Sequence, residues 1–594
     1  MTGILVPAAG FDHFGGWTLD SQFDLEMGAS YLLAHGLGAP VADATTLIDV
    51  AAAGCYRVWV RAKDWVPSHH PGRFAVTIDG VRLPMEFGAN GLDWSWADAG
   101  VVDLAVGEVS VTLTDLTGFD GRCDAIYLTT GDDLPVDGAG PDARTWRRRL
   151  RGLPDEPVDG GEFDVVVVGG GITGCAAALA AGRSGLRVAL VQNRPVLGGN
   201  ASTEIGLTPR GETGPLVDEL AARSGDGELA AMKVLTAERT ISVFVEQQVF
   251  DLRRDCDRIT SIDARAARSG VETRFRGRFF IDCTGTAKLG LLAGVETMFG
   301  AESRSEYNEP LAPDQRGEYH HGNTLFFRTR DADEPTRFPA VPWAVTVAKD
   351  YANLGGQLER PGIDNAPGPV AGHARTPDPD IRRRMLQPLT HFWEYGQDLD
   401  PYSDSERIRD HLFRAVYGTL ANVKQLEPET YANLTFDWVA HVPGQGEFRR
   451  YRGAYVVTEN DIRDHRQFDD VVAWNSGAFC LHYPGHETYD FRLKDWKWDT
   501  RDGLPFEIPL RCLYPDGVDN LLAAGKHISV THVAGSVTKF MGNGAQHAVA
   551  AAAAVKVCLC HDVAPRDLRG DLLAEVQGLV TELGGSAEHV PEAV

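Results

Sequence analysis

The sequence predicts a fold in two parts: an N-terminal all-β sandwich, then an α/β dinucleotide-binding domain interrupted by an α+β insertion. Three observations predict it. Residues 1–132 contain short runs in which apolar and polar residues alternate. The apolar, β-branched run Val165–Val168 then leads into the glycine-rich turn Gly169–Gly174. A long stretch rich in aromatic residues separates this turn from an alanine-rich helix at about 545–560.

Composition limits the classes of partner. The chain has 594 residues, enough for several domains, and a formal net charge of -26. Such a charge disfavours nucleic acid and anionic membrane surfaces and favours a small-molecule substrate. No stretch is apolar for the ~18–20 residues of a membrane span, and no basic region precedes an apolar run at the N-terminus, so we expect a cytoplasmic protein. The nine cysteines show no C-x-x-C spacing, so we expect reduced thiols and no metal site.

The first 132 residues read as a β-sandwich. Apolar residues alternate at 56–60, 74–78 and 109–113, and Asp79-Gly80 fits a hairpin turn. Gly15-Gly16-Trp17 and the segment 118–126 resemble the carbohydrate-binding-like sandwich of golvesin and xanthan lyases. Five tryptophans could form a sugar-stacking platform, although packing in a core is the commoner fate of this residue. They are Trp17, Trp59, Trp65, Trp94 and Trp96.

The composition changes after the sandwich. Residues 133–161 are rich in Pro, Gly and Asp, which predicts a linker. Its basic cluster, Arg147–Arg151, could bind an anion, but in so acidic a chain we expect it to dock on acidic surface. Beyond it we expect a first part of the dinucleotide domain (162–330), a substrate-binding insertion (331–505), a return segment (506–562) and a C-terminal helix and tail (563–594).

The glycine-rich turn opens a complete βαβ unit. Gly169, Gly171 and Gly174 form a G-x-G-x-x-G turn that lets a helix N-terminus approach a pyrophosphate. A helix of small residues and the strand 188–191 follow it. Gln192 stands where an acid normally binds the ribose. Its amide can bind a diol through the carbonyl but without a charge, which weakens a case for NAD and leaves FAD plausible.

The continuation resembles the glutathione-reductase-like FAD-dependent oxidoreductases. The pair Gly198-Gly199 matches the glycine pair that lies near the pyrophosphate in this family. Residues 243–249 match the strand that meets adenine, and residues 279–285 match the strand that ends in a T-G turn. Residues 520–525 match the strand that returns to the FAD domain. The helix opened by Met541–Gly544 would present its positive end to the flavin. The resemblance implies FAD as the cofactor and these binding residues: Gly169, Gly171, Ile172, Thr173, Gly174, Gln192, Asn193, Arg194, Gly198, Gly199, Asn200, Ser202, Val249, Thr284, Gly285, Gly525, Gly542, Asn543 and Gly544.

Four segments narrow the resemblance to one group of FAD-dependent oxidoreductases over about 162–562: 198–204, 446–450, 508–515 and 527–532. Two positions depart from that group. Gly446 stands where the group tends to have Arg, and Asn543–His547 replaces a smoother helix entry. A second G-x-G-x-x-G unit and a redox C-x-x-C are missing from the sequence, which argues against a pyridine-nucleotide disulfide reductase.

Hydride transfer from an alcohol or amine carbon to a flavin needs a base for the heteroatom proton. His482, His532 and His547 are the catalytic candidates, and His527 is a fourth histidine near the return strand. Arg449 and Arg450 could clamp a carboxylate or polarise a carbonyl, or could instead pair with nearby acids, Glu447 or Asp461. Arg210 is a third cationic candidate for substrate binding.

The preferred function is oxidation of a CH–OH group in a carbohydrate-like or glycosylated small molecule. His482 or His532 would take the hydroxyl proton as a hydride passes to flavin N5, and oxygen or another electron acceptor would reoxidise the flavin. One alternative is a reductase, desaturase or oxygenase that acts on a natural-product or carboxylate substrate. The other is a non-catalytic sugar-binding protein. The sequence leaves the oligomeric state open.

Overall fold

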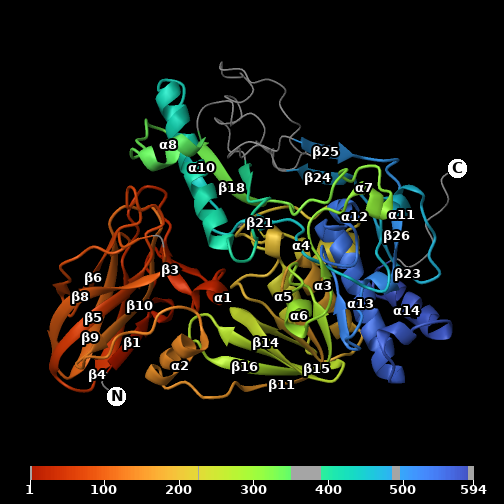
Figure 1. The fold of residues 1–594 in the computed structure, drawn as a ribbon, viewed down its shortest axis with the longest axis horizontal. Coiled ribbons are helices and arrows are strands. Elements are labelled where there is room, and N and C mark those ends of the chain that lie inside the picture. Colours follow the sequence, from red (N-terminus) through yellow and green to blue (C-terminus); the bar gives the residue numbers. More distant parts are fainter. Residues whose placement is uncertain (1–2, 92, 225–226, 349–389, 484–494, 586–594) are drawn as a thin grey trace.

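A computed structural model describes residues 3–91, 93–224, 227–348, 390–483 and 495–585, and Figure 1 shows the N-terminal sandwich beside the α/β core. The middle of the predicted insertion, 349–389, lies outside the described residues. So do 484–494 in the same insertion and the last part of the predicted tail, 586–594. No described helix is both long enough and apolar enough to cross a membrane.

The N-terminal module is a sandwich of two antiparallel sheets. One has the order β2-β3-β10-β5-β8 with β1 on β10, and the other has the order β4-β9-β6-β7. The predicted alternations at 56–60, 74–78 and 109–113 lie in β5, β6 and β9, and their apolar side chains are buried. The strands are β1 (Gly3–Pro7), β2 (Thr18–Asp20), β3 (Tyr31–Ala34), β4 (Ala44–Val50), β5 (Gly54–Ala62), β6 (Phe74–Ile78), β7 (Val81–Arg82), β8 (Ser95–Leu104), β9 (Gly107–Asp115) and β10 (Gly121–Thr129).

The five tryptophans of the sandwich pack against protein. Trp17 is buried edge-on against Phe74, with ring centroids 5.6 Å apart. Trp65 is buried against Trp343 of the insertion. Trp94 donates to Glu406, Trp96 packs edge-on against Trp146, and Trp59 lies under the guanidinium of Arg57. Packing, the commoner fate, therefore accounts for all five positions.

The predicted linker is more ordered than its composition suggests. Helix α2 (Pro141–Leu150) begins with Pro at its first turn, where a missing N–H costs nothing, and buries Trp146. Strand β11 (Val158–Val168) starts before the end of the predicted linker. Arg147 pairs with the buried Asp124, so part of the basic cluster does dock on an acidic side chain.

The core sheet carries the dinucleotide-binding unit. Its order is β13-β12-β11-β16-β15-β14, with β27 beside β16. Strands β11, β12, β13, β16 and β27 run parallel, so their carboxyl ends share one edge, where ligands of such sheets bind. Elements of this unit are α3 (Ile172–Arg183), β12 (Val188–Val191), β13 (Ile241–Phe244), β14 (Gln247–Asp255), β15 (Arg258–Ala266), β16 (Glu272–Asp282), α6 (Lys288–Ala293), β27 (Leu521–Ala523), α12 (His532–Thr538), α13 (Met541–His561) and α14 (Asp571–Glu582).

Two boundaries differ from the expectation. The segment 243–249 is two strands, because Glu246 has a positive φ of 55° that ends β13 and turns the chain into β14. The alanine-rich helix starts at Met541, four residues earlier than expected, so Gly542–Gly544 form its first turn. A Cβ on Gly544 would lie 2.5 Å from Oγ1 of Thr173, so this glycine allows α13 to pack closely on α3.

The insertion supplies a second sheet and a long helix. Strands β18 (Asn323–Asp331), β19 (Thr390–Tyr395), β20 (Leu434–Val439) and β21 (Gly444–Gln445) form the sheet, so it begins before the predicted boundary at 331. Helix α10 (Ser405–Leu426) runs between this sheet and the sandwich (Figure 1). Strands β24 (Phe479–Tyr483) and β25 (Asp495–Asp499) form a separate hairpin.

Candidate functional site

A cavity of about 1160 Å³ lies along the carboxyl edge of the core sheet and extends to the insertion. This volume exceeds the ~300–1,000 Å³ of most small-ligand pockets, which suits a dinucleotide together with a second molecule. The predicted cofactor residues that line it are Gly169, Gly171, Ile172, Thr173, Gln192, Asn193, Arg194, Gly198, Gly199, Asn200, Val249, Thr284, Gly285 and Gly525. Five others lie outside its lining: Gly174, Ser202, Gly542, Asn543 and Gly544.

The glycine turn shapes one wall by leaving out side chains. Gly169 has a φ of 99°, and a Cβ there would lie 2.5 Å from the carbonyl oxygen of Cys283. The nearest atom to a Cβ on Gly171 would be Cα of Gly199, 3.9 Å away, so the space above this turn is open. Gly171 is also the N-cap of α3, whose free N–H groups attract an anion. The wall therefore fits a pyrophosphate.

The side-chain amide of Gln192, just after β12, already makes hydrogen bonds within the protein. Its Oε1 accepts from the N–H of Gly170 at 2.8 Å, and its Nε2 donates to the carbonyl of Val196 at 3.1 Å. The oxygen expected to meet a ribose diol thus has one lone pair left. Gln192 holds the glycine turn and the loop after β12 together beside the ribose position.

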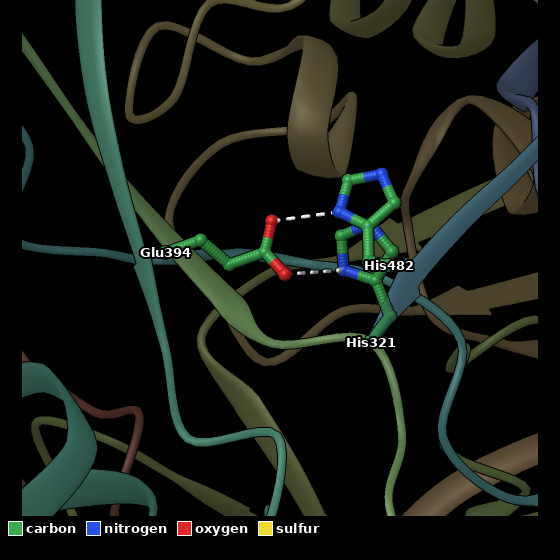
Figure 2. A group of neighbouring side chains, drawn as sticks. All are labelled: His321, Glu394 and His482. Atoms are coloured by element: carbon green, nitrogen blue, oxygen red, sulfur yellow. Dashed lines mark hydrogen bonds and ion pairs between the residues drawn. The ribbon is translucent and has the colours of Figure 1, made fainter. Parts of the chain in front are cut away.

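Three titratable side chains of the insertion meet at the other end of the cavity (Figure 2). His482 on β24 and His321 before β18 line the cavity, and Glu394 on β19 lies buried behind them. Nδ1 of His482 is 2.8 Å from Oε2 of Glu394, and Nδ1 of His321 is 3.9 Å from Oε1. The two imidazole rings lie with centroids 3.9 Å apart and planes tilted by 34°. We call these three residues the His–Glu–His cluster.

Charges in the His–Glu–His cluster favour an ion pair. Burial raises the pKa of Glu394, but His482 and His321 outweigh it and bring the pKa down to about 2. Burial lowers the pKa of His482, but Glu394 and Cys480 outweigh it and raise the pKa to about 9. His321 has a pKa well below its usual value, because of burial and the neighbouring His482. At neutral pH the proton therefore lies on His482.

Two glycines make room for the cluster. A Cβ on Gly446 would lie 2.1 Å from Cγ of His321, and a Cβ on Gly322 would lie 2.7 Å from Cγ of Glu394. A larger residue at either position would collide with the cluster. The departure at Gly446, seen in the sequence as a missing Arg, thus has a structural reason in the ring of His321.

The His–Glu–His cluster also has the donor atoms of a metal site. One ligand atom from each residue lies within 4.8 Å of the others. However, Nδ1 of His321 is 2.8 Å from the carbonyl oxygen of Gly322, so this nitrogen carries a hydrogen and offers no lone pair. This bond leaves the lone pair on Nε2 of His321, so it does not exclude metal coordination, while the close pair of His482 and Glu394 can hold a proton.

The other candidate histidines lie away from the cavity lining. His532 is the first residue of α12, capped by Thr531, and burial lowers its pKa to about 4. His547 is fully buried against Asn475, and burial lowers its pKa to about 3. His527 faces the carbonyl of Asp282 at 3.0 Å. Of the four histidines considered from the sequence, only His482 reaches the cavity.

The three arginine candidates differ in whether they line the cavity. Arg450 is fully buried, pairs with Glu302 at 2.8 Å and does not line the cavity, so it acts inside the protein. Arg449 and Arg210 do line the cavity. Arg449 lies over the ring of Tyr402 at 4.9 Å, and no carboxylate of the described residues pairs with it. It is therefore available to an anionic ligand.

Sequence reasoning missed several lining residues. Lys526 and Lys539 bond to the carbonyls of Gln445 and Cys480, and burial lowers the pKa of Lys526 to about 8. Glu394 and His321 carry no motif, because their role depends on contacts between distant strands. The departure at Gly446 was the one visible signal. Four further lining residues come from the sandwich: Gln22, Phe23, Leu25 and Glu26.

Comparisons with known proteins identify the family of the chain. A family model described as FAD dependent oxidoreductase matches residues 164–580. A search of curated proteins found no match. Among solved structures, the chain is similar to a geranylgeranyl bacteriochlorophyll reductase-like protein from Thermoplasma acidophilum, with 12% identity and a TM-score of 0.32 over 71% of this chain and 84% of that one.

Two further similar structures match different parts. The flavin-dependent monooxygenase PieE, in complex with FAD and substrate, has 12% identity and a TM-score of 0.31 over 71% of this chain and 61% of its own. A family 35 carbohydrate binding module from Clostridium thermocellum has 16% identity and a TM-score of 0.19 over 22% of this chain and 100% of its own. The family model, in contrast, spans the glycine turn, the insertion and α13.

Proposed function

Because the chain belongs to the FAD-dependent oxidoreductase family, we propose that it oxidises a CH–OH group of a carbohydrate-like or glycosylated small molecule. FAD is the cofactor, and the enzyme is an oxidoreductase. The observation that carries the proposed reaction is the His482–Glu394 pair in the cavity wall, in which the neutral form of His482 would accept the substrate proton. Oxygen or another electron acceptor completes the turnover.

The described residues fit FAD. The open space above Gly171, the N-terminus of α3 and the Gly198-Gly199 pair would hold the pyrophosphate, and Gln192 with Asn193 would lie at the ribose. Thr284, Gly285 and Gly525 complete this wall. When bound, FAD accepts a hydride at N5.

His482 would act as the base. Its Nδ1 faces Glu394, so the other nitrogen, Nε2, is the one that takes the substrate proton. Nε2 lies 3.1 Å from Sγ of Cys480, which also lines the cavity. Glu394 orients the ring and stabilises the imidazolium that forms. Since the pKa of His482 is about 9, the base is neutral in a growing fraction of molecules as pH rises toward that value.

The sugar part of the proposal rests on the resemblance of the sandwich. Polar groups such as Asn323, Thr324 and Gln445 line the cavity and suit a hydroxylated substrate. The five tryptophans of the sandwich do not support a sugar substrate, since each of them packs against other protein groups. They also weaken the alternative of a non-catalytic sugar-binding protein.

A second candidate is a reductase, desaturase or oxygenase with a carboxylate substrate. Arg449 favours it, because its guanidinium lies over Tyr402 in the cavity lining, where it can donate two hydrogen bonds to a carboxylate, although the neighbouring Asp400 already feels its charge. Protonated His482 would then donate a proton rather than accept one.

Anaerobic mixing of the flavoprotein with a panel of sugars, glycosides and hydroxy acids tests these proposals. Loss of flavin absorbance near ~450 nm with a sugar or glycoside supports CH–OH oxidation. Bleaching by carboxylates alone favours the desaturase form of the second candidate, whereas a reductase or oxygenase substrate would leave the oxidised flavin unchanged. Metal analysis and chelator treatment of the same sample test the His–Glu–His cluster, and loss of bleaching after chelation would overturn the role of His482 as base.

A further inference from the structure

The sandwich contributes directly to the cavity. Gln22, Phe23, Leu25 and Glu26 line it, and they belong to α1 (Asp24–Met27) and the residues before this short helix. Figure 1 shows α1 on the side of the sandwich that faces the core. A module attached only to bring the enzyme to a polymer would have no need to form part of the internal ligand cavity.

The position of this segment is fixed by contacts with the two strand ends that mark the nucleotide side. Ser21 donates to the carbonyl of Asn193 at 3.0 Å and accepts from Arg194 at 3.0 Å, both just after β12. Asp24 pairs with Arg265 on β15. Arg265 lies opposite Gln248 of β14, the strand that carries Val249.

A third set of contacts joins this segment to the insertion. Gln22 donates to the carbonyl of His441 at 3.0 Å. Asp20 accepts from Arg409 of α10 at 2.6 Å, and both side chains are fully buried. Burial would raise the pKa of Asp20, but Arg409 and Arg194 hold it well below its usual range. The segment is therefore clamped on three sides and is a rigid wall.

The cavity-lining residues around this segment indicate which half of FAD it faces. In a Rossmann-type unit the residue that ends the second strand lies at the adenosine ribose, and here Gln192 and Asn193 occupy that place. Leu25 offers an apolar surface there, together with Leu291 of α6 and Val249. The cluster of His321, Glu394 and His482 is supplied by other elements.

We propose that residues 22–26 of the sandwich form the adenosine side of the FAD site, so that the N-terminal module is part of cofactor recognition. The recognised chemical class is an adenosine diphosphate moiety. The proposal rests on the proposed placement of the cofactor and not on the substrate, so it survives if CH–OH oxidation proves wrong.

Binding of ADP, FAD and riboflavin to full-length apoprotein tests the proposal. Leu25→Ala removes an apolar contact and is expected to weaken ADP and FAD by a similar factor of about 3–10, with riboflavin unchanged. Leu25→Glu adds a negative charge near the diphosphate and is expected to weaken both by more than about tenfold. The matched control is Leu47→Glu on β4, since Leu47 is 56% exposed on the same module.

Calorimetry with ADP and quenching of flavin fluorescence with FAD and riboflavin give the three affinities. Equal weakening of riboflavin would place the segment at the flavin half and overturn the proposal. Unchanged ADP and FAD affinities in both Leu25 variants would remove the segment from the site. If Leu25→Glu proves unstable, Leu25→Ala alone decides, because truncation of a half-buried side chain leaves the backbone contacts of the segment in place.

Discussion

The two ends of the cavity are lined by different kinds of chemical group. The nucleotide end consists of glycines, backbone N–H groups and a clamped segment of the sandwich, whereas the opposite end consists of titratable side chains from the insertion. Backbone groups bind a cofactor without changing charge, while His321, Glu394 and His482 can hold and move a proton. The difference teaches that cofactor retention and proton chemistry are separable in this chain, and substitutions can test that separation.

Gly174→Ala is expected to have a large effect that is confined to the nucleotide end. A Cβ on Gly174 would lie 1.7 Å from the carbonyl oxygen of Gly169 and would deform the turn. We expect a loss on the order of 3 kcal/mol, more than ~100-fold in FAD affinity. Flavin content after purification and fluorescence titration measure it. Gly578→Ala on α14, with no atom within 4 Å of the new Cβ, is the control and should retain flavin fully.

His482→Gln tests the opposite end. Removal of the base should slow substrate oxidation about 10²–10⁴-fold while FAD affinity stays unchanged. Stopped-flow reduction of the flavin and a parallel FAD titration provide the two readouts. His561→Gln on the surface of α13 is the matched control, since this side chain is 41% exposed. Full turnover in the His482 variant would remove this residue from the mechanism.

Arg449→Met distinguishes the two candidate substrate classes. If the substrate carries a carboxylate, loss of a charged hydrogen bond should raise KM by about 10–100-fold with kcat little changed. For a neutral sugar, KM should stay within about twofold. Steady-state kinetics decide, with the exposed Arg304→Met as control. An increased KM for neutral sugars would contradict both assignments.

Glu394→Gln should give the smallest change, a shift in the pH range over which kcat/KM rises. A carboxylate stabilises the charged form of a neighbouring His, so its removal lowers the pKa of His482. In the wild type, kcat/KM should rise with pH up to about 9, and in the variant the limb should move down by about 1–3 pH units. A limb that remained near 9 would show that Glu394 does not set the protonation of His482.

The elements of the nucleotide end could be predicted from the sequence, because they are adjacent along the chain. The strand, the glycine turn and the following helix lie within one short segment, and their spacing alone implies a phosphate-binding turn. The return strand and α13 were recognised by resemblance. Only the limits of single elements differed, where a left-handed residue such as Glu246 broke an apolar run.

The opposite end could not be predicted in the same way. Glu394 and His482 come from two strands and His321 from the residues before a third, all far apart in sequence, and no spacing rule connects them. His532 and His547 were further candidates until their burial separated them from His482. Residues 22–26 carry no motif, since their position depends on how the sandwich docks. Gly446 shows that a departure from a family pattern can mark a contact that only the folded chain reveals.

The fully buried pair of Arg409 and Asp20 limits how this protein could evolve by domain shuffling. A foreign sandwich of the same fold would remove Asp20 and leave Arg409 with only Glu406 and Asp410 of its own helix, which changes the balance of buried charge at the interface. Arg122 of β10, paired with Asp410 at 2.6 Å, adds the same requirement on a second strand. The two modules must therefore be inherited together, and a change on one side of the interface requires a compensating change on the other.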